Sequence, residues 1–235
     1  MGRIKQLILG ICLLFSTSVF ADSFNTNCTN NQNCFNEDEY IYEGSQPLID
    51  LYNQSGTTNL NSSDDAWSGQ VNLGFTFDRW GYSWSKARMS TNGCVNFIGR
   101  SDGRNSANCQ DYTPQALPYR NYTLYPLWTD LIRGNNSKML FKQFDDYVVF
   151  GWYYMKEYNR SSSNSFEAIL YHNDTYEFRY RELDISNHDV LIGEQGFGSA
   201  QKKTYLFYND GQGYGNLDLF LAGYGGPDIE NGGSL

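Results

Sequence analysis

The stretch from Val71 to Ile98 constrains the fold of this chain more than any other. Two strand-like runs, Val71 to Phe77 and Tyr82 to Ser90, flank a turn at residues 78–81, and a third run follows Asn92-Gly93. Asn-Gly between two alternating runs favours the positive φ angles of a type I′ turn in a two-residue hairpin. The sequence therefore predicts a three-stranded antiparallel meander.

Similar short runs continue through most of the remaining chain, separated by turns rich in Asn, Asp, Gly and Ser. In residues 175–181 the alternation is strict, with Tyr176, Phe178 and Tyr180 on one face. No amphipathic helical pattern interrupts the series. We therefore expect an all-β chain, an antiparallel β-sandwich-like single domain, with a barrel as the alternative closure. The expected strands after the meander are Tyr122–Ile132, Lys138–Phe144, Tyr147–Tyr154, Ser165–Tyr171, Thr175–Arg181, Val190–Ile192 and Thr204–Tyr208.

The amino terminus has the organisation of a secretory signal peptide. Arg3 and Lys5 precede a short apolar run, Leu7 to Phe15, and Val19 and Ala21 supply the small residues before a cleavage site. The run is shorter than the roughly 20 apolar residues that a membrane-spanning helix needs. Cleavage after Ala21 and a secreted or cell-surface location are expected, with an uncleaved anchor as the alternative.

Composition divides the rest of the chain into three parts. Residues 22–66 form a polar N-terminal extension, rich in Asn and mostly loop, with one or two short strands. Residues 67–209 hold the β-domain. Residues 210–235 are a Gly-rich C-terminal tail that we expect to be flexible.

Cysteine usage is consistent with an exported chain. Beyond the signal peptide the cysteines are Cys28, Cys34, Cys94 and Cys109. Four cysteines allow three disulfide connectivities, and Cys28–Cys34 with Cys94–Cys109 is the simplest because each bond closes a local loop. No Cys-x-x-Cys pair and no neighbouring histidine occur, so no metal site is predicted from these residues.

The charge pattern narrows the classes of partner. The formal net charge is -9 and there is no basic stripe, which disfavours nucleic acid and anionic membranes as partners. No cofactor is predicted. Asp102–Asn105 and Asn209–Gly213 carry oxygen ligands on bendable backbone and make calcium the alternative, although ordinary turns use the same residues.

The dense part of the chain resembles the nidogen-like (NIDO) domain family over roughly residues 67–209. The resemblance implies an extracellular β-sandwich-like module with an interaction or scaffolding role, of the kind found in matrix, adhesion and surface proteins. It transfers no catalytic residue. Because EGF-like companion modules are missing, the bacterial or viral exported type is favoured over a basement-membrane protein. The matching segments are Asn72–Phe97, Asp111–Pro118, Leu124–Leu131, Tyr147–Met155, Phe166–Tyr180 and Val190–Gly196.

Aromatic side chains are the candidate binding residues. Trp80, Tyr82, Trp84, Trp152 and Tyr154 could form a platform for sugar rings or a protein partner, because aromatics are enriched at contact surfaces. The alternative is that they pack in the core.

No reaction can be read from the chain, and we expect it not to be an enzyme. His172 and His188 are predicted to be solvated turn residues, and no G-x-S-x-G nucleophile elbow occurs. The expected function is a secreted or surface-exposed, non-enzymatic module for adhesion or structural interaction, with a protein or glycan ligand. A carbohydrate-binding module is the alternative, and a glycoside hydrolase ranks third.

Overall fold

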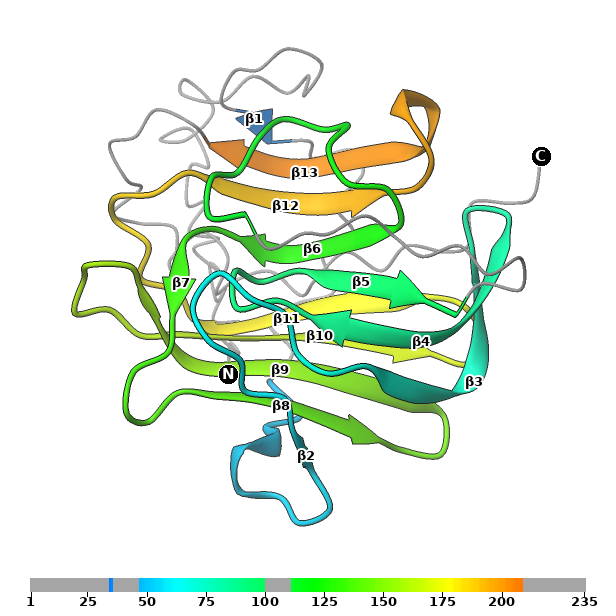
Figure 1. The fold of residues 1–235 in the computed structure, drawn as a ribbon, viewed down its shortest axis with the longest axis horizontal. Coiled ribbons are helices and arrows are strands. Elements are labelled where there is room, and N and C mark those ends of the chain that lie inside the picture. Colours follow the sequence, from blue (N-terminus) through cyan, green and yellow to red (C-terminus); the bar gives the residue numbers. More distant parts are fainter. Residues whose placement is uncertain (1–33, 36–46, 100–110, 209–235) are drawn as a thin grey trace, which may run out of the picture.

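The computed structural model describes residues 34–35, 47–99 and 111–208. It shows two antiparallel β-sheets packed against each other (Figure 1), so the predicted all-β, sandwich-like fold is confirmed. The first sheet contains, in spatial order, β1 (Cys34–Phe35), β13 (Lys202–Tyr208), β12 (Val190–Gln195), β6 (Thr123–Trp128), β5 (Val95–Ile98), β4 (Tyr82–Met89) and β3 (Val71–Arg79).

The second sheet is built mainly from two consecutive hairpins. Its spatial order is β11 (Tyr176–Glu182), β10 (Asn164–Tyr171), β9 (Tyr147–Glu157), β8 (Lys138–Gln143) and β2 (Thr58–Asn59). The short strand β7 (Leu131–Ile132) pairs with the end of β9 outside this path. Two single 3₁₀ turns, η3 (Leu51–Asn53) and η4 (Ser199–Gln201), complete the described elements.

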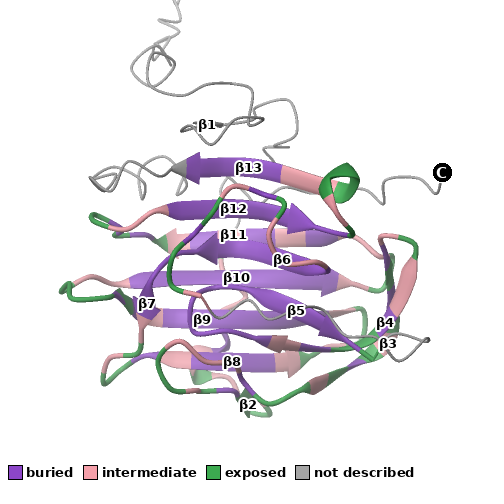
Figure 2. Ribbon diagram, turned by 45° about the horizontal axis from the view of Figure 1, so that its top comes forward, coloured by how far each residue is buried: buried purple, intermediate pink, exposed green. Residues whose placement is uncertain are grey.

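The core lies between the sheets and follows the alternation read from the sequence. On β11, Tyr176, Phe178 and Tyr180 are buried in it, while the residues between them are half-buried. β9 is buried on both faces along most of its length, as expected for a strand in the middle of a sheet. Figure 2 shows the buried strands at the centre of the molecule and the exposed residues concentrated in the connecting loops.

The predicted meander β3–β4–β5 is present, but its type I′ turn is not the one expected. Trp80 and Gly81 have φ angles of 54° and 77°. They connect Arg79 to its strand partner Tyr82, which is the two-residue arrangement that type I′ turns require. Glycine tolerates this conformation at no steric cost, whereas Trp80 adopts it under strain.

The expected type I′ turn at Asn92-Gly93 is wrong, because this pair serves long-range contacts. Only Gly93 of the two has a positive φ, 79°, and a Cβ there would lie 1.9 Å from the carbonyl oxygen of Leu127. Asn92 is fully buried, donates to Asp65 Oδ1 at 2.8 Å and accepts from the Leu131 amide at 2.8 Å. Tertiary contacts therefore explain this Asn-Gly pair.

The N-terminal extension begins to dock well before residue 67. Leu51 is fully buried against the outer face of the second sheet, where Leu48 and Ile49 also pack. The Glu167 carboxylate on β10 accepts hydrogen bonds from the amides of Ile49 and Asp50 at 2.8 and 2.9 Å. β2 then pairs with β8. Residues 47–66 thus belong to the domain, and the boundary predicted at residue 67 is too late.

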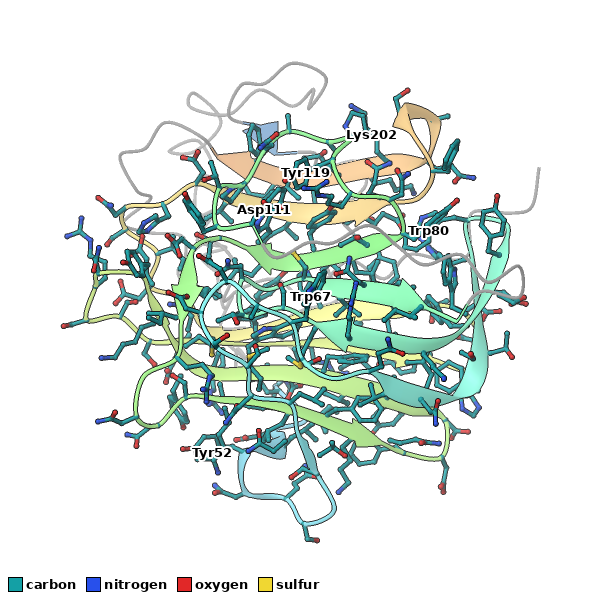
Figure 3. The ribbon with its side chains drawn as sticks, viewed as in Figure 1. Tyr52, Trp67, Trp80, Asp111, Tyr119 and Lys202 are labelled. Atoms are coloured by element: carbon teal, nitrogen blue, oxygen red, sulfur yellow. The ribbon has the colours of Figure 1, made fainter. Side chains whose placement is uncertain are left out.

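The outer face of the first sheet is covered by the segment that precedes β6. The Trp128 indole donates to the Asp111 carbonyl at 2.7 Å, and the Tyr119 ring stacks on Trp128 with centroids 4.9 Å apart. Leu117 is buried in the same apolar cluster. Figure 3 shows Asp111 and Tyr119 lying over β12 and β6.

A buried ion pair ties the meander to the far strands of its own sheet. Arg79, at the end of β3, lies 2.8 Å from Glu194 on β12, and both side chains are almost fully buried. Burial alone would lower the pKa of Arg79, but the Glu194 carboxylate raises it on balance, so the guanidinium stays charged. Tyr176 and Tyr205, whose hydroxyls are 3.0 Å apart, extend this polar cluster across the two sheets.

Some of the sequence-based predictions concern residues outside the described ranges. They include the signal peptide, Cys28, Cys109, both calcium-type turns and the Gly-rich tail. Cys94 is buried, and its pairing with Cys109 stays a prediction. Within the described ranges, no helix has the length and apolar character to cross a membrane.

Candidate functional site

The predicted aromatic platform does not exist as a surface. Trp84 and Trp152 are fully buried, and each indole nitrogen donates to a backbone carbonyl inside the core. Trp80 and Tyr82 are only partly buried, yet they pack against the same core cluster. These residues stabilise the sandwich, as the core-packing alternative proposed.

Strict alternation along β9 would place Tyr154 on the same face as Trp152. A bulge in the strand puts the two residues on opposite faces instead. β10 pairs Phe166 with Trp152 and Asn164 with Met155, so two tyrosines on β9 face a single residue on β10. Tyr154 has a φ of 53°, a strained value for an aromatic residue. Trp152 and Met155 consequently face the core, while Tyr153 and Tyr154 both face outward.

Neighbouring side chains fix the re-aimed Tyr154 ring. Tyr52 meets it edge-on, with ring centroids 5.0 Å apart, and the Arg181 guanidinium lies 5.4 Å from its centroid. The Tyr154 carbonyl accepts a hydrogen bond from Ser137 Oγ. The same Oγ accepts a hydrogen bond from the Gly134 amide. The bulge thereby ties β9 to the loop between β7 and β8.

Beside this bulge lies a solvent-open cavity of about 800 Å³. Two loops at the same end of the sandwich enclose it, one between β7 and β8 and the other between β9 and β10; both extend at the left edge of Figure 1. The lining residues are Ile132, Arg133, Gly134, Asn135, Asn136, Ser137, Tyr154, Lys156, Tyr158, Asn159, Arg160, Ser161, Ser162 and Ser163. Ligand cavities in proteins commonly span about 300–1,000 Å³.

The lining is polar and its charge is opposite to that of the chain. It contributes three cations, Arg133, Lys156 and Arg160, and none of the described lining residues is Asp or Glu. The chain as a whole has a formal net charge of -9. Amide and hydroxyl side chains make up most of the remainder, and Tyr158 keeps 38% of its surface exposed. The cavity therefore offers hydrogen bonds, an aromatic ring and positive charge together.

A second cluster lies behind the β9–β10 loop and is centred on His188. The expectation that His188 is a solvated turn residue is wrong. Its Nδ1 is 2.9 Å from Glu157, and its Nε2 is 3.6 Å from Asp130. His172, by contrast, is exposed in the β10–β11 turn, where its ring packs on Phe75 with centroids 4.1 Å apart.

The two carboxyl groups of this cluster are perturbed in opposite directions. Burial raises the pKa of Asp130 to about 6, with the nearby His188 partly opposing the rise. Burial would also raise the pKa of Glu157, but hydrogen bonds from Ser186, Asn187 and His188 lower it on balance. Glu157 is thus a structural acceptor that shapes the loop before β12.

Sequence patterns contain only partial signals for these features. Arg160 to Ser163 are visible as a polar loop, but nothing marks their proximity to residues 133–137. The Tyr153-Tyr154 bulge has no local signature, because the loop and strand contacts that require it come from distant residues. Among the described residues, no group of three His, Cys, Asp or Glu side chains is arranged to hold a metal ion.

Comparison with known proteins gives one result. The model of the family described as NIDO related matches residues 42–212. This range includes the docked segment from residue 47 and every described strand except β1. No curated protein and no solved structure matches the chain.

Proposed function

The chain belongs to the NIDO-related family, and we propose that it is an exported, non-enzymatic module for adhesion or structural interaction. Its binding site in this proposal is the polar cavity between the β7–β8 and β9–β10 loops. The leader-like amino terminus and the cysteines support export. Family modules of this kind serve interaction roles, which is consistent with a site built from loops on a rigid sandwich.

The observation that carries the proposal is the backbone strain at Tyr154. A positive φ at an aromatic residue costs on the order of 1–3 kcal/mol and persists only where surrounding contacts enforce it. Bulges of this type are over-represented next to functional sites, where they re-aim a side chain. Here the bulge places Tyr154 in the wall of the cavity instead of in the core.

The chemistry of the lining supports binding over catalysis. Glycosidases need two carboxyl groups flanking the scissile bond, and the described lining contains neither Asp nor Glu. Glu157 lies close by on β9, but its oxygens already accept bonds from the amides of residues 186–188. A carbohydrate-binding role is the second candidate. The Asn and Ser side chains of the cavity favour it, whereas the tryptophans that the sequence offered as a sugar platform are buried.

The test is binding of the full chain to an array of immobilised matrix proteins and glycans. Tyr158→Ala removes an exposed ring in the cavity, while Tyr112→Ala removes a ring that is 56% exposed and outside it. We expect the first substitution to weaken binding at least tenfold and the second to leave it unchanged. Equal effects of both substitutions, or hydrolysis of any arrayed polysaccharide by the pure chain, would contradict the proposal.

A further inference from the structure

We infer that the cavity recognises a glycan bearing carboxylate groups, such as a chain containing uronic or sialic acid. This inference deepens the proposed function and rests on it. It commits to the charge of the ligand as well as to its class. The carrying observation is the set of three cations, Arg133, Lys156 and Arg160, in a lining whose described members include no acid.

The three cations are available for a ligand. Arg133 uses its Nε to hold the Ser62 carbonyl at 2.7 Å, and Arg160 donates one hydrogen bond to the side chain of Asn187. Among the described residues, none of the three forms an ion pair with a carboxylate. All three side chains are exposed. Guanidinium groups bind carboxylates through two parallel hydrogen bonds, which gives geometric as well as electrostatic selectivity.

The Lys156 stem lies close to Gly134 on the opposite loop. A Cβ built on Gly134 would lie 2.7 Å from Lys156 Cε and 3.1 Å from its Cδ. The lysine stem therefore crosses the backbone of the β7–β8 loop at the point where no side chain blocks it.

The remaining lining fits a sugar better than a peptide. Hydroxyl and amide groups of Ser161, Ser163, Asn135 and Asn159 can pair with the many hydroxyls of a sugar ring. The exposed ring of Tyr158 can stack against its apolar face. A cavity of about 800 Å³ also encloses a few linked rings, whereas a folded protein partner presents a broad surface.

The experiment measures binding of the full chain to an array of uronic- and sialic-acid-containing glycans. Each glycan is paired with its methyl-esterified counterpart, and a poly-glutamate peptide is included as an acidic probe without sugar. We expect binding to the carboxylated member of at least one pair, at least tenfold loss on esterification, and weakening as salt is raised. Binding of esterified and free glycans alike, binding of poly-glutamate as strongly as of any glycan, or no binding to any carboxylated glycan would overturn the inference.

Matched variants locate the effect in the cavity. Lys156→Gln and Arg160→Gln should each weaken binding about tenfold, while Lys86→Gln removes an exposed charge on β4 and should change nothing. Gly134→Ala keeps every charge but displaces Lys156, so it should also weaken binding, which diffuse attraction to a basic surface would not explain. Unchanged thermal unfolding midpoints confirm that each variant is folded.

The outcomes separate this inference from the proposed function. Loss of binding in Tyr158→Ala, with Lys156→Gln and Arg160→Gln unaffected, would leave the cavity as a binding site and refute its selectivity for carboxylates. Retention of full binding in all the cavity variants would refute both.

Discussion

Replacement of Asp130 by asparagine should change how the stability of the domain depends on pH. Burial beside Asp64, Asp65 and Glu157 raises the pKa of Asp130 from 3.8 to about 6. The unfolded chain therefore binds fewer protons at this site than the folded chain between those two values. By linkage, the free energy of unfolding must fall as pH rises through this window, because ionising Asp130 is more difficult in the folded state.

The magnitude follows from the shift. One pKa unit corresponds to 1.36 kcal/mol, so a rise of about two units corresponds to roughly 3 kcal/mol. About half of this loss in the free energy of unfolding should be present at pH 5, and nearly all of it at pH 7. The amide that replaces the carboxyl group in the variant cannot ionise. The free energy of unfolding of Asp130→Asn, relative to the original chain, should therefore rise by roughly 2.4 kcal/mol between pH 4 and pH 7.

The assay is urea unfolding followed by tryptophan fluorescence at pH 4, 5, 6 and 7, with the slope m compared at each pH. Asp145→Asn, which replaces an exposed acid in the β8–β9 turn, is the matched control. His188→Gln should extend the loss to higher pH, because His188 lowers the pKa of Asp130. A change of less than about 0.5 kcal/mol in the stability difference for Asp130→Asn over this range would refute the raised pKa as its cause.

Two further predictions concern the backbone at Gly93 and the docking of residues 47–51. Gly93→Ala should destabilise the domain by roughly 3–5 kcal/mol, because the new Cβ meets the Leu127 carbonyl and φ is positive; Gly81→Ala, with open space around it, should cost only about 1–2 kcal/mol. Equal losses in chemical denaturation would contradict this reading of the two turns. Glu167→Gln should cost about 1–3 kcal/mol and speed proteolysis within residues 47–51, because it removes a charged acceptor for two backbone amides. Unchanged cleavage rates there would show that Glu167 does not hold this segment.

Much of the sandwich could be predicted from local patterns alone. Alternation placed Tyr176, Phe178 and Tyr180 on the buried face of β11, and the Asp145-Asp146 turn was correctly assigned between β8 and β9. These features depend on neighbours two to four residues away, so a window of sequence contains their cause. The short segments at 47–59 could not be assigned in this way because their apolar residues show no period.

The candidate site could not be predicted from such windows. Its walls come from residues 132–137 and 154–163, which lie together because β7 and β8 both pair with β9. The aromatic residues chosen from the sequence had the right chemistry for binding, but four of the five pack in or against the core. Exposure is decided by which face of a strand meets the other sheet, and the bulge at Tyr154 changed that face midway along β9.

By itself the sequence determined the strands, most of the turns and the inward faces, because alternation and backbone preference act locally. Only the tertiary structure decided where Asn92-Gly93 would be used, which histidine would lie between two carboxyl groups, and where a basic cavity would form in an acidic chain. Each of these depends on groups that are far apart along the chain. Their free energies are gained only when the two sheets and their loops come together, so no local pattern records them.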